Sequence, residues 1–321
     1  MSRYARQICL PGVGAAGQAR LAKARVLVVG AGGLGASLLP ALAGAGIGEL
    51  TIIDGDRVEE SNLHRQTLFR MSDLGRPKAE VAAETLTGLN PDCRIVPVVG
   101  WLDPANAHAF LRGADVVVDA ADMFAVTYVL SDLCHALRKP LISASVLGTA
   151  GYVGGFCGGA PSYRAVFPDL PAQLQSCATG GVMGPAVATM GALQAQMCLA
   201  IVLGHRPSPL GQVISVDLGN WRLSGFRFDF APEPPRPTPA IVAEPDLRKD
   251  DLVIELRGAE ELPVSRLPMA ARLTAEEIAR LEPRQDQRVV FVCATGLRAW
   301  RGATALAARG HPDVAILADR G

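Results

Sequence analysis

A glycine-rich turn near the start of the chain has the residue types of a nucleotide site. The stretch RVLVVGAGGLGASLL, residues 25–39, is an apolar run that breaks into glycines and resumes as a helix-like pattern of small residues. Gly30, Gly32 and Gly35 form a G-x-G-x-x-G spacing, and Gly33 is a further glycine inside it. Such a turn brings the backbone close to a phosphate and starts a helix whose first N–H groups face an anion. Dinucleotide enzymes and some ATP enzymes share this pattern.

The residues after the second apolar run discriminate between these nucleotides. Asp54 ends that run, where an acidic residue binds ribose hydroxyls, and a nicotinamide dehydrogenase also fits this feature. Displacement on a phosphate chain needs cations at its oxygens, whereas a dehydrogenase needs few. Arg65 and Lys78 suit that role, although solvated surface charge is the alternative for both. The polar candidates beside them are Asn62 and Gln66.

Two cysteines have sequence surroundings that suit thiol chemistry. In VVFVCATGLRAW an apolar run precedes a six-residue loop, Cys293 to Arg298, and a helical pattern. Backbone N–H groups, the helix dipole and Arg298 would together stabilise a thiolate or persulfide. Cys177 lies in LQSCATGGVMGP, a glycine-rich segment that suits a buried small side chain poorly. The alternative for Cys293 is a strand-end cysteine in a degenerate domain, and the alternative for Cys177 is a plain buried thiol.

Alternating strand-like and helix-like patterns must position these residues. β-branched apolar runs at 25–30, 50–54, 93–99, 115–120 and 140–146 alternate with helical patterns. This order predicts an α/β fold with a Rossmann-like, doubly wound, mostly parallel sheet that binds ligands at the carboxyl ends of its strands.

A change of composition after residue 228 predicts a domain boundary. We assign 1–228 to the first domain, 229–247 to a proline-rich linker and 248–321 to a second, smaller α/β domain. The linker sequence is DFAPEPPRPTPAIVAEPD, which is dense in proline and almost without periodicity.

Bulk composition narrows the class of protein. The 321 residues include 31 Lys and Arg and 31 Asp and Glu, so the formal net charge is zero. Bulk charge thus favours neither a nucleic acid nor a membrane surface as a partner. The seven cysteines show no C-x-x-C pair, which argues against a disulfide framework or a zinc knuckle. With no signal-peptide pattern or membrane span expected, we predict a cytoplasmic protein.

Several separated motifs together resemble the MoeB/ThiF family, relatives of the ubiquitin-activating enzymes. The resemblance covers about residues 1–228. The motifs, in order, are RYARQ, GAGGLG, DGDRV, SNLHRQTLF, GRPKAE, VVVDAADM and CATGGVMGP. The resemblance implies that ATP and Mg²⁺ are used to adenylylate the C-terminal glycine carboxylate of a small ubiquitin-like sulfur carrier of the MoaD/ThiS kind. It also implies a homodimer, because Arg6 resembles the arginine that reaches into the partner subunit's site.

The resemblance assigns roles to individual residues of the first domain. It makes Asp54 the ribose ligand and Asp122 the Mg²⁺ ligand, and Cys177 resembles the crossover-loop cysteine that takes part in sulfur transfer in some members. The triphosphate contacts would be Asn62, Arg65, Gln66 and Lys78.

Two departures from the family pattern change what is expected. Met123 follows the metal-binding acid where an asparagine is common, and Ser162 and Ala165 occupy positions where the first zinc cysteines usually stand. We therefore expect no structural zinc, because the four thiolates are missing.

The second domain resembles a rhodanese domain. The loop from Cys293 to Arg298 matches the C-x-x-G-x-[RS] active-site loop, and VIELRGAEE matches an early strand motif with Glu255 where an aspartate is usual. The domain is short, and it lacks the usual closing segment.

Together these features predict an adenylyltransferase coupled to sulfur transfer from a Cys293 persulfide, supplied by a cysteine desulfurase or another donor. The alternatives are an adenylyltransferase with an inactive tail, an NAD-dependent oxidoreductase and a non-catalytic dimerisation partner. The sequence leaves open which carrier protein and which pathway are served.

Overall fold

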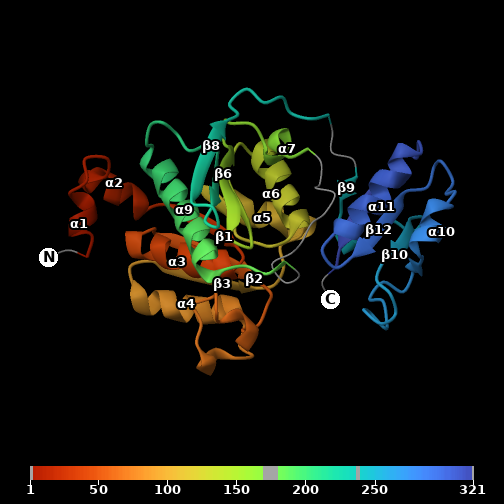
Figure 1. Cartoon of the computed structure of the whole chain (residues 1–321), viewed down its shortest axis with the longest axis horizontal. Coiled ribbons are helices and arrows are strands. Elements are labelled where there is room, and N and C mark those ends of the chain that lie inside the picture. The colour runs from red at the N-terminus through yellow and green to blue at the C-terminus, as the bar shows by residue number, and fades with distance from the viewer. Residues whose placement is uncertain (1–2, 169–179, 236–238, 320–321) are drawn as a thin grey trace. The chain divides into compact units, whose positions relative to one another are not determined.

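The computed structural model describes residues 3–168, 180–235 and 239–319 of the chain (Figure 1). The chain divides into two compact units, and the division along its C-terminal part falls between Glu233 and Pro234. Each unit has its own sheet and is described separately.

The first unit is built on an eight-stranded sheet of described residues in the order β3-β2-β1-β4-β5-β6-β7-β8. The strands from β3 to β5 are parallel and contain the apolar runs that predicted them. This confirms the predicted mostly parallel α/β fold. These strands are β1 (Arg25–Val29), β2 (Glu49–Asp54), β3 (Arg94–Val99), β4 (Val116–Asp119) and β5 (Pro140–Leu147).

The other three strands are antiparallel and extend one edge of the sheet. The sequence analysis assigned no strands to this part of the chain, which contains many glycines and begins with a tight reversal after β5. They are β6 (Ala150–Cys157), β7 (Gln212–Asp217) and β8 (Arg222–Arg227), and every residue of β8 is exposed.

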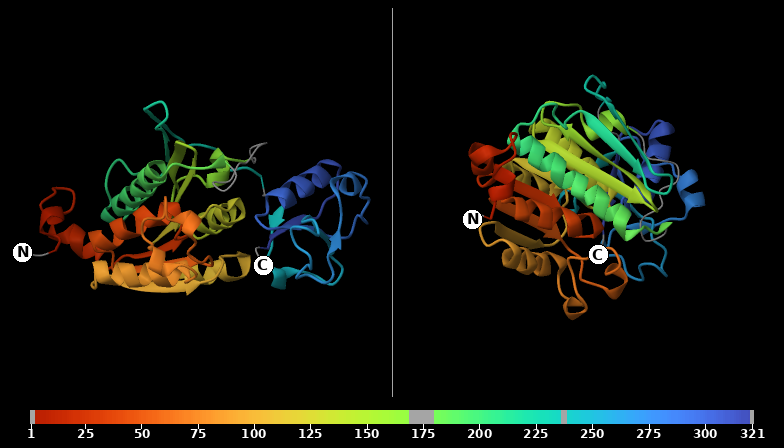
Figure 2. Two further views of the ribbon diagram at one scale, coloured as in Figure 1. Left: turned by 60° about the horizontal axis from the view of Figure 1, so that its bottom comes forward. Right: turned by 60° about the vertical axis from the view of Figure 1, so that its left-hand side comes forward.

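The strand order determines on which face of the sheet each connecting helix lies. From β1 to β3 the chain moves toward one edge, and from β3 to β5 it moves back, so right-handed crossovers place α3 and α4 on one face and α5 and α6 on the other. The long helix α9 packs against α3, β4, β5 and β6 (Figures 1 and 2). The helices are α1 (Ala5–Ile8), α2 (Gly14–Leu21), α3 (Gly33–Ala45), α4 (Lys78–Leu89), α5 (Pro104–Gly113), α6 (Phe124–Ala136), α7 (Tyr163–Val166) and α9 (Gly184–Leu203), with short 3₁₀ turns η1 (Glu60–Asn62) and η2 (Met71–Asp73).

Among the described helices, α9 is long and apolar enough to cross a membrane on length and composition alone. Half of its most apolar window is buried inside the fold. Gly191 explains the close packing, because a Cβ there would lie 2.4 Å from the carbonyl oxygen of Leu34 in α3. This is the packing of a core helix.

The second unit has a five-stranded parallel sheet in the order β11-β10-β12-β13-β9 among the described residues. Its central strands β12 and β13 bury Val290, Val292, Ala315 and Leu317 in one core. Its elements are β9 (Ala240–Ile241), η3 (Glu244–Asp246), β10 (Leu252–Glu255), β11 (Ala271–Arg272), α10 (Ala275–Ala279), β12 (Val289–Cys293), α11 (Leu297–Ala308) and β13 (Val314–Ala318).

Two described elements, the strand β9 and the 3₁₀ turn η3, lie inside the segment interpreted as a linker. β9 pairs with β13, so residues 240 and 241 belong to the second sheet. The strand is only two residues long and lies among prolines, and its pairing is with a strand more than 70 positions later. Neither feature leaves a periodic signal in the sequence.

Candidate functional site

The glycine turn follows β1 where the strand order reverses. Gly30 has a φ of +102°, in the region that favours glycine. A Cβ atom on it would lie 2.5 Å from the carbonyl oxygen of Ala120, the residue after β4. The turn therefore lies against the end of β4, at the position where open α/β sheets bind ligands.

The turn leads directly into the N-terminus of α3. Gly32 is the N-cap residue of this 13-residue helix. A Cβ on Gly33 would lie 2.6 Å from Val187 Cγ1, and a Cβ on Gly35 would lie 2.6 Å from the carbonyl oxygen of Gly30. Only glycine allows this packing, which presents the first N–H groups and the positive end of the helix dipole to an anion.

Asp54 at the end of β2 holds the glycine turn in place. Its Oδ2 accepts a hydrogen bond from the Ala31 N–H (2.7 Å) and its Oδ1 accepts one from the Asp56 N–H (2.8 Å). The side chain is buried, and burial raises the pKa of this carboxyl, while the charge of Lys78 and the two N–H groups act against the rise. Asp54 therefore shapes the loop.

Lys78 is a buried cation at the first position of α4. Its Nζ lies 3.0 Å from Asp56 Oδ2, and its backbone N–H donates to the Asp56 carbonyl (2.9 Å). Only 4% of the residue is exposed, so Lys78 is no solvated surface charge. The sequence analysis missed Asp56, although the D-G-D spacing places it two residues after Asp54.

Two amide side chains near the turn have unused hydrogen-bonding groups. Asn62 in η1 and Gln66 in the following turn are buried, and Gln66 Nε2 lies 3.8 Å from the Cβ position of Gly32. Within the described part of the chain, neither Asn62 Oδ1 nor Gln66 Oε1 has a hydrogen-bond partner. Buried oxygens of this kind are rare, and they indicate a site whose ligand or water completes the bonding.

Arg65 lies between these amides and keeps its charge unpaired among the described residues. Its Nη1 donates to the Ser61 carbonyl oxygen (3.2 Å) and lies 2.9 Å from His64 Nε2. Its Cγ is 3.6 Å from the Cβ position of Gly33. A cation beside the N-terminus of α3 adds to the attraction for an anion.

Asp122 is exposed and lies just beyond β4. The turn that carries it is fixed by Asp119, which the sequence analysis missed. The buried carboxylate of Asp119 accepts hydrogen bonds from Ser143 Oγ (2.8 Å) and from the Ala121 N–H (3.2 Å). In the part of the chain that the structure describes, no group of three or more His, Cys, Asp or Glu side chains could hold a metal ion.

Arg6 lies away from the glycine turn of its own chain. It belongs to α1, and its neighbour Gln7 donates to the carbonyl oxygen of Ala45 (2.9 Å), at the last residue of α3. The glycines stand at the other end of that 13-residue helix, roughly 18 Å away at 1.5 Å per residue. Arg6 is exposed at its own position.

Cys293 lies at the end of β12, against the start of α11. Its Sγ accepts a hydrogen bond from the Ala299 N–H (3.4 Å) in the first turn of the helix. Gly296, with a φ of +83°, is the N-cap residue, so Leu297 and Arg298 lie in the helix and the loop is shorter than the sequence indicated. The sulfur meets the positive end of a 12-residue helix, but only 1% of the residue is exposed.

Arg298 is held beside this sulfur by an acidic partner. Its Nη2 donates to Glu261 Oε1 (2.5 Å), and its Nη1 lies 3.4 Å from the Leu256 carbonyl oxygen. The bond to Glu261 is the main cause of a raised Arg298 pKa, and Cys293 contributes to it. The same bond lowers the pKa of Glu261.

A buried ionic group supports the Cys293 strand end. Arg257 bonds both carboxylate oxygens of Glu255 and the carboxylate of Asp319, and the Asp319 N–H donates to the Cys293 carbonyl (3.0 Å). These bonds raise the pKa of Arg257 despite its burial. Glu255, singled out for its place in the strand motif, therefore fixes the geometry around the cysteine.

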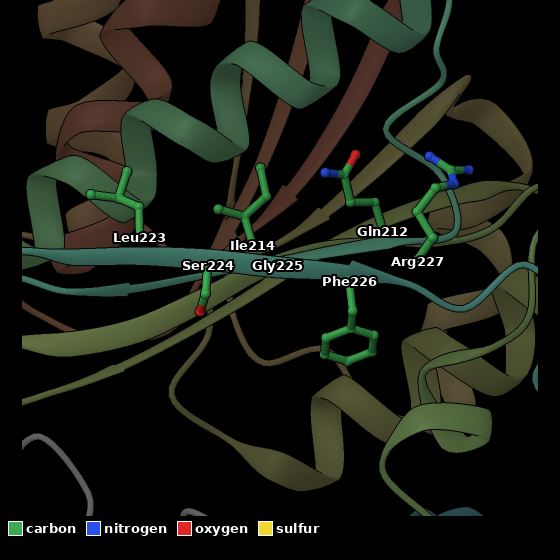
Figure 3. Close-up of a pocket in the computed structure, with 7 residues that line it drawn as sticks. All are labelled: Gln212, Ile214, Leu223, Ser224, Gly225, Phe226 and Arg227. Atoms are coloured by element: carbon green, nitrogen blue, oxygen red, sulfur yellow. The ribbon is translucent and has the colours of Figure 1, made fainter.

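Cys177, the other candidate cysteine, lies outside the described residues. A shallow hollow elsewhere in the first unit is lined by β7 and β8, and Figure 3 shows Leu223 and Phe226 on opposite sides of the strand ribbon. No predicted site residue lines this hollow.

Comparison with known proteins places the first unit in a family. The ThiF family model matches residues 4–236, so the chain belongs to the ThiF family. The SAMP-activating enzyme E1 of Haloferax volcanii is 41% identical over 219 residues, which cover 68% of this chain and 81% of that protein.

Other relatives are longer than this chain. The adenylyltransferase and sulfurtransferase uba4 of Aspergillus fumigatus is 44% identical over 219 residues, or 64% of this chain and 44% of that protein. The adenylyltransferase and sulfurtransferase MOCS3 of Drosophila grimshawi is 42% identical over 231 residues, or 71% and 51%. The alignments thus span about half the length of these two relatives.

Solved structures share the fold. The crystal structure of E. coli MccB with MccA-N7isoASN superimposes with a TM-score of 0.63 at 24% identity and covers 72% of this chain and 74% of that one. At this identity the likeness shows the fold alone.

Proposed function

We propose that this protein uses ATP to adenylylate the C-terminal glycine carboxylate of a small ubiquitin-like sulfur carrier, and that Cys293 then delivers sulfur to it. The observation that supports the first step most strongly is the pair of cations, Arg65 and Lys78, associated with the glycine turn and with buried amides whose oxygens have no hydrogen-bond partner among the described residues. Membership of the ThiF family also supports this step. The nicotinamide alternative has no observation that favours it over ATP.

In the first step, a carboxylate oxygen of the carrier attacks the α-phosphorus of ATP, and the bond to pyrophosphate breaks. The N-terminus of α3, Arg65 and Lys78 neutralise the phosphate oxygens and align the phosphorus. Asp54 holds the turn and meets the ribose hydroxyls. Among the described residues, the amide oxygens of Asn62 and Gln66 have no hydrogen-bond partner. In the proposed mechanism, these amide groups rotate so that their NH₂ groups donate to the triphosphate.

Mg²⁺ bound with the triphosphate would supply further charge neutralisation, with Asp122 as its protein ligand and phosphate and water oxygens at its other positions. Asp119 keeps the Asp122 turn in place through Ser143 and the Ala121 N–H.

Arg6 fits this mechanism as a residue of a homodimer. It stands at the far end of α3 from its own glycine turn and is exposed there, so in the proposed mechanism it completes the site of a partner subunit.

In the second step, the terminal sulfur of a Cys293 persulfide attacks the acyl carbonyl, and AMP leaves. Cys177 then attacks the Cys293 sulfur of the resulting acyl disulfide. This releases the carrier thiocarboxylate and forms a Cys177–Cys293 disulfide, which an external thiol reduces. The helix N-terminus and Arg298 stabilise the anionic sulfur.

A second candidate function is adenylylation alone, with a tail that only recruits a donor. The burial of Cys293 favours it, because 1% exposure leaves the sulfur little access to a donor unless the chain around it moves.

The proposed partners are the carrier ending in Gly-Gly and a cysteine desulfurase or another persulfide donor, all in the cytoplasm. Zero formal net charge favours neither a nucleic acid nor a membrane surface.

The first step is tested by exchange of labelled pyrophosphate into ATP in the presence of Mg²⁺ and such a carrier. We expect carrier-dependent exchange that Arg65→Ala lowers by about 100-fold and that Arg70→Ala, at an exposed arginine nearby, leaves almost unchanged. Equal rates in the two variants, or tight NAD binding without exchange, would refute the proposal.

A further inference from the structure

Glu233, the last residue of the first unit, lies within the proline-rich segment and is bound to a serine 71 positions earlier. Its Oε1 accepts the Ser162 N–H (2.7 Å), and its Oε2 accepts the Ser162 Oγ–H (2.6 Å). His135 Nδ1 lies 3.7 Å from the same carboxylate. We call this pairing of Glu233 with Ser162 the clasp.

The clasp rests on a firmly bound base. Ser162 is buried and is the N-cap residue of α7, where its Oγ also accepts the Ala165 N–H. The next residue, Tyr163, donates its N–H to Ser131 Oγ (3.1 Å) in α6. Arg164 is buried and bonds both carboxylate oxygens of Asp132 in α6 (2.6 and 2.9 Å). The clasp therefore joins the end of the first unit to a part of it that is itself hydrogen-bonded to α6.

The described chain between β8 and the clasp has further attachments. Phe228 is buried and stacks on Phe156 at a centroid distance of 5.3 Å, and Asp229 accepts two hydrogen bonds from the Arg227 guanidinium in β8 (2.7 and 2.6 Å). Without the clasp, the last residue held in this way would be Asp229, four positions earlier. Pro234 and Pro235 follow Glu233 directly, and because proline fixes φ, they preserve the direction that the clasp sets.

We propose that Glu233 is a positioning residue for sulfur transfer: its clasp with Ser162 fixes the base of the proline-rich segment that connects the first unit to Cys293. Ser162 stands at one of the positions where the family pattern has a zinc cysteine, and here its N–H and Oγ bind a carboxylate.

The functional part of this inference rests on the proposed function. Releasing the base adds residues to the connection between the last held residue of the first unit and Cys293, and the effective concentration of a tethered group falls as its tether lengthens. Adenylylation does not use the connection and keeps its rate. The clasp therefore affects only the second of the two proposed steps.

The test compares Glu233→Ala with Glu244→Ala, a matched removal of an exposed glutamate further along the chain. We expect Glu233→Ala to remove the hydrogen-exchange protection of the Ser162 amide and to slow single-turnover thiocarboxylate formation by about two- to threefold. Pyrophosphate exchange keeps the wild-type rate, since no step of adenylylation uses the tether. Ser162→Ala, which removes only the Oγ bond, gives a smaller change in the same direction.

Two results would overturn the proposal. Unchanged protection and transfer in Glu233→Ala would mean that the clasp holds nothing in solution. Equal losses of pyrophosphate exchange and transfer would mean that it only stabilises the first unit. Absence of pyrophosphate exchange in the wild type is a different failure, that of the proposed function, and the exchange protection of Ser162 then tests the clasp by itself.

Discussion

The two units use the same backbone arrangement around different contents. In the first, β1 runs into Gly30 and then α3, and in the second, β12 runs into Gly296 and then α11. Both glycines have positive φ angles, +102° and +83°. The N-terminus of α3 lies near Gln66 and near Arg65, whose charge is unpaired among the described residues, whereas the N-terminus of α11 is occupied by the sulfur of Cys293.

In the proposed mechanism, the first helix binds an anion from outside and the second helix supports a reacting sulfur of the chain itself. Near the first helix lie two cations and, among the described residues, two amides whose oxygens have no hydrogen-bond partner. The second helix already contacts an atom that can become an anion.

The largest expected effect tests the role of Cys293 in the second unit. Cys293→Ser should abolish the persulfide that forms when the protein is incubated with a cysteine desulfurase and cysteine, measured by intact mass. It should leave pyrophosphate exchange unchanged, because the sulfur has no part in adenylylation. Cys9→Ser, at an exposed cysteine, is the control. Persulfide loading that survives in Cys293→Ser would assign it to another residue.

The next largest effect tests the role of Lys78 in the first unit. Lys78→Met keeps most of the side-chain volume but removes the buried charge. We expect a loss in pyrophosphate exchange of roughly 1,000-fold, or about 4 kcal/mol. Asp56 is 45% exposed, so solvent compensates for its lost partner. Lys23→Met, at an exposed lysine, should have no effect, and a similar loss in both variants would refute the assigned role.

A smaller effect tests the shape of the first turn. Gly30→Ala should lower the free energy of unfolding by about 3 kcal/mol, because its φ disfavours a side chain and its Cβ would press against the carbonyl of Ala120. Gly44→Ala, where a Cβ meets nothing within 4 Å near the end of α3, should raise it by about 0.5 kcal/mol. Urea unfolding of both variants measures the difference, and equal stabilities would contradict the geometry.

The smallest effect concerns another buried sulfur, that of Cys157. Burial raises the pKa of Cys157 from 9.0 to about 12. A raised pKa stabilises the fold fully below pH 9, and that contribution is lost as pH rises toward 12. From pH 8 to 10.5 the wild type should therefore lose about 2 kcal/mol more than Cys157→Ala. Urea titrations at both pH values check this, with Cys9→Ala as the exposed control. Parallel losses in wild type and Cys157→Ala would exclude the burial effect.

The sequence predicted those features that repeat along the chain or have a local signature. Strand and helix alternation predicted the parallel part of the sheet, and glycine spacing placed the turn after β1. The contacts of Lys78 with Asp56 and of Asp119 with Ser143 depend on residues 22 and 24 positions apart. Such contacts leave no periodic signal, and only the fold reveals them. The sequence analysis did not predict the pairing of β9 with β13 for the same reason.

The most direct test of the account is the intact mass of a Gly-Gly carrier after incubation with ATP, Mg²⁺, a cysteine desulfurase and cysteine. The account predicts sulfur in place of one terminal oxygen with the wild type, an unchanged carrier with Arg65→Ala, and the acyl-adenylate alone with Cys293→Ser. Thiocarboxylate formed by Cys293→Ser, or none formed by the wild type, would contradict the claim that the two units act in succession on one carboxylate.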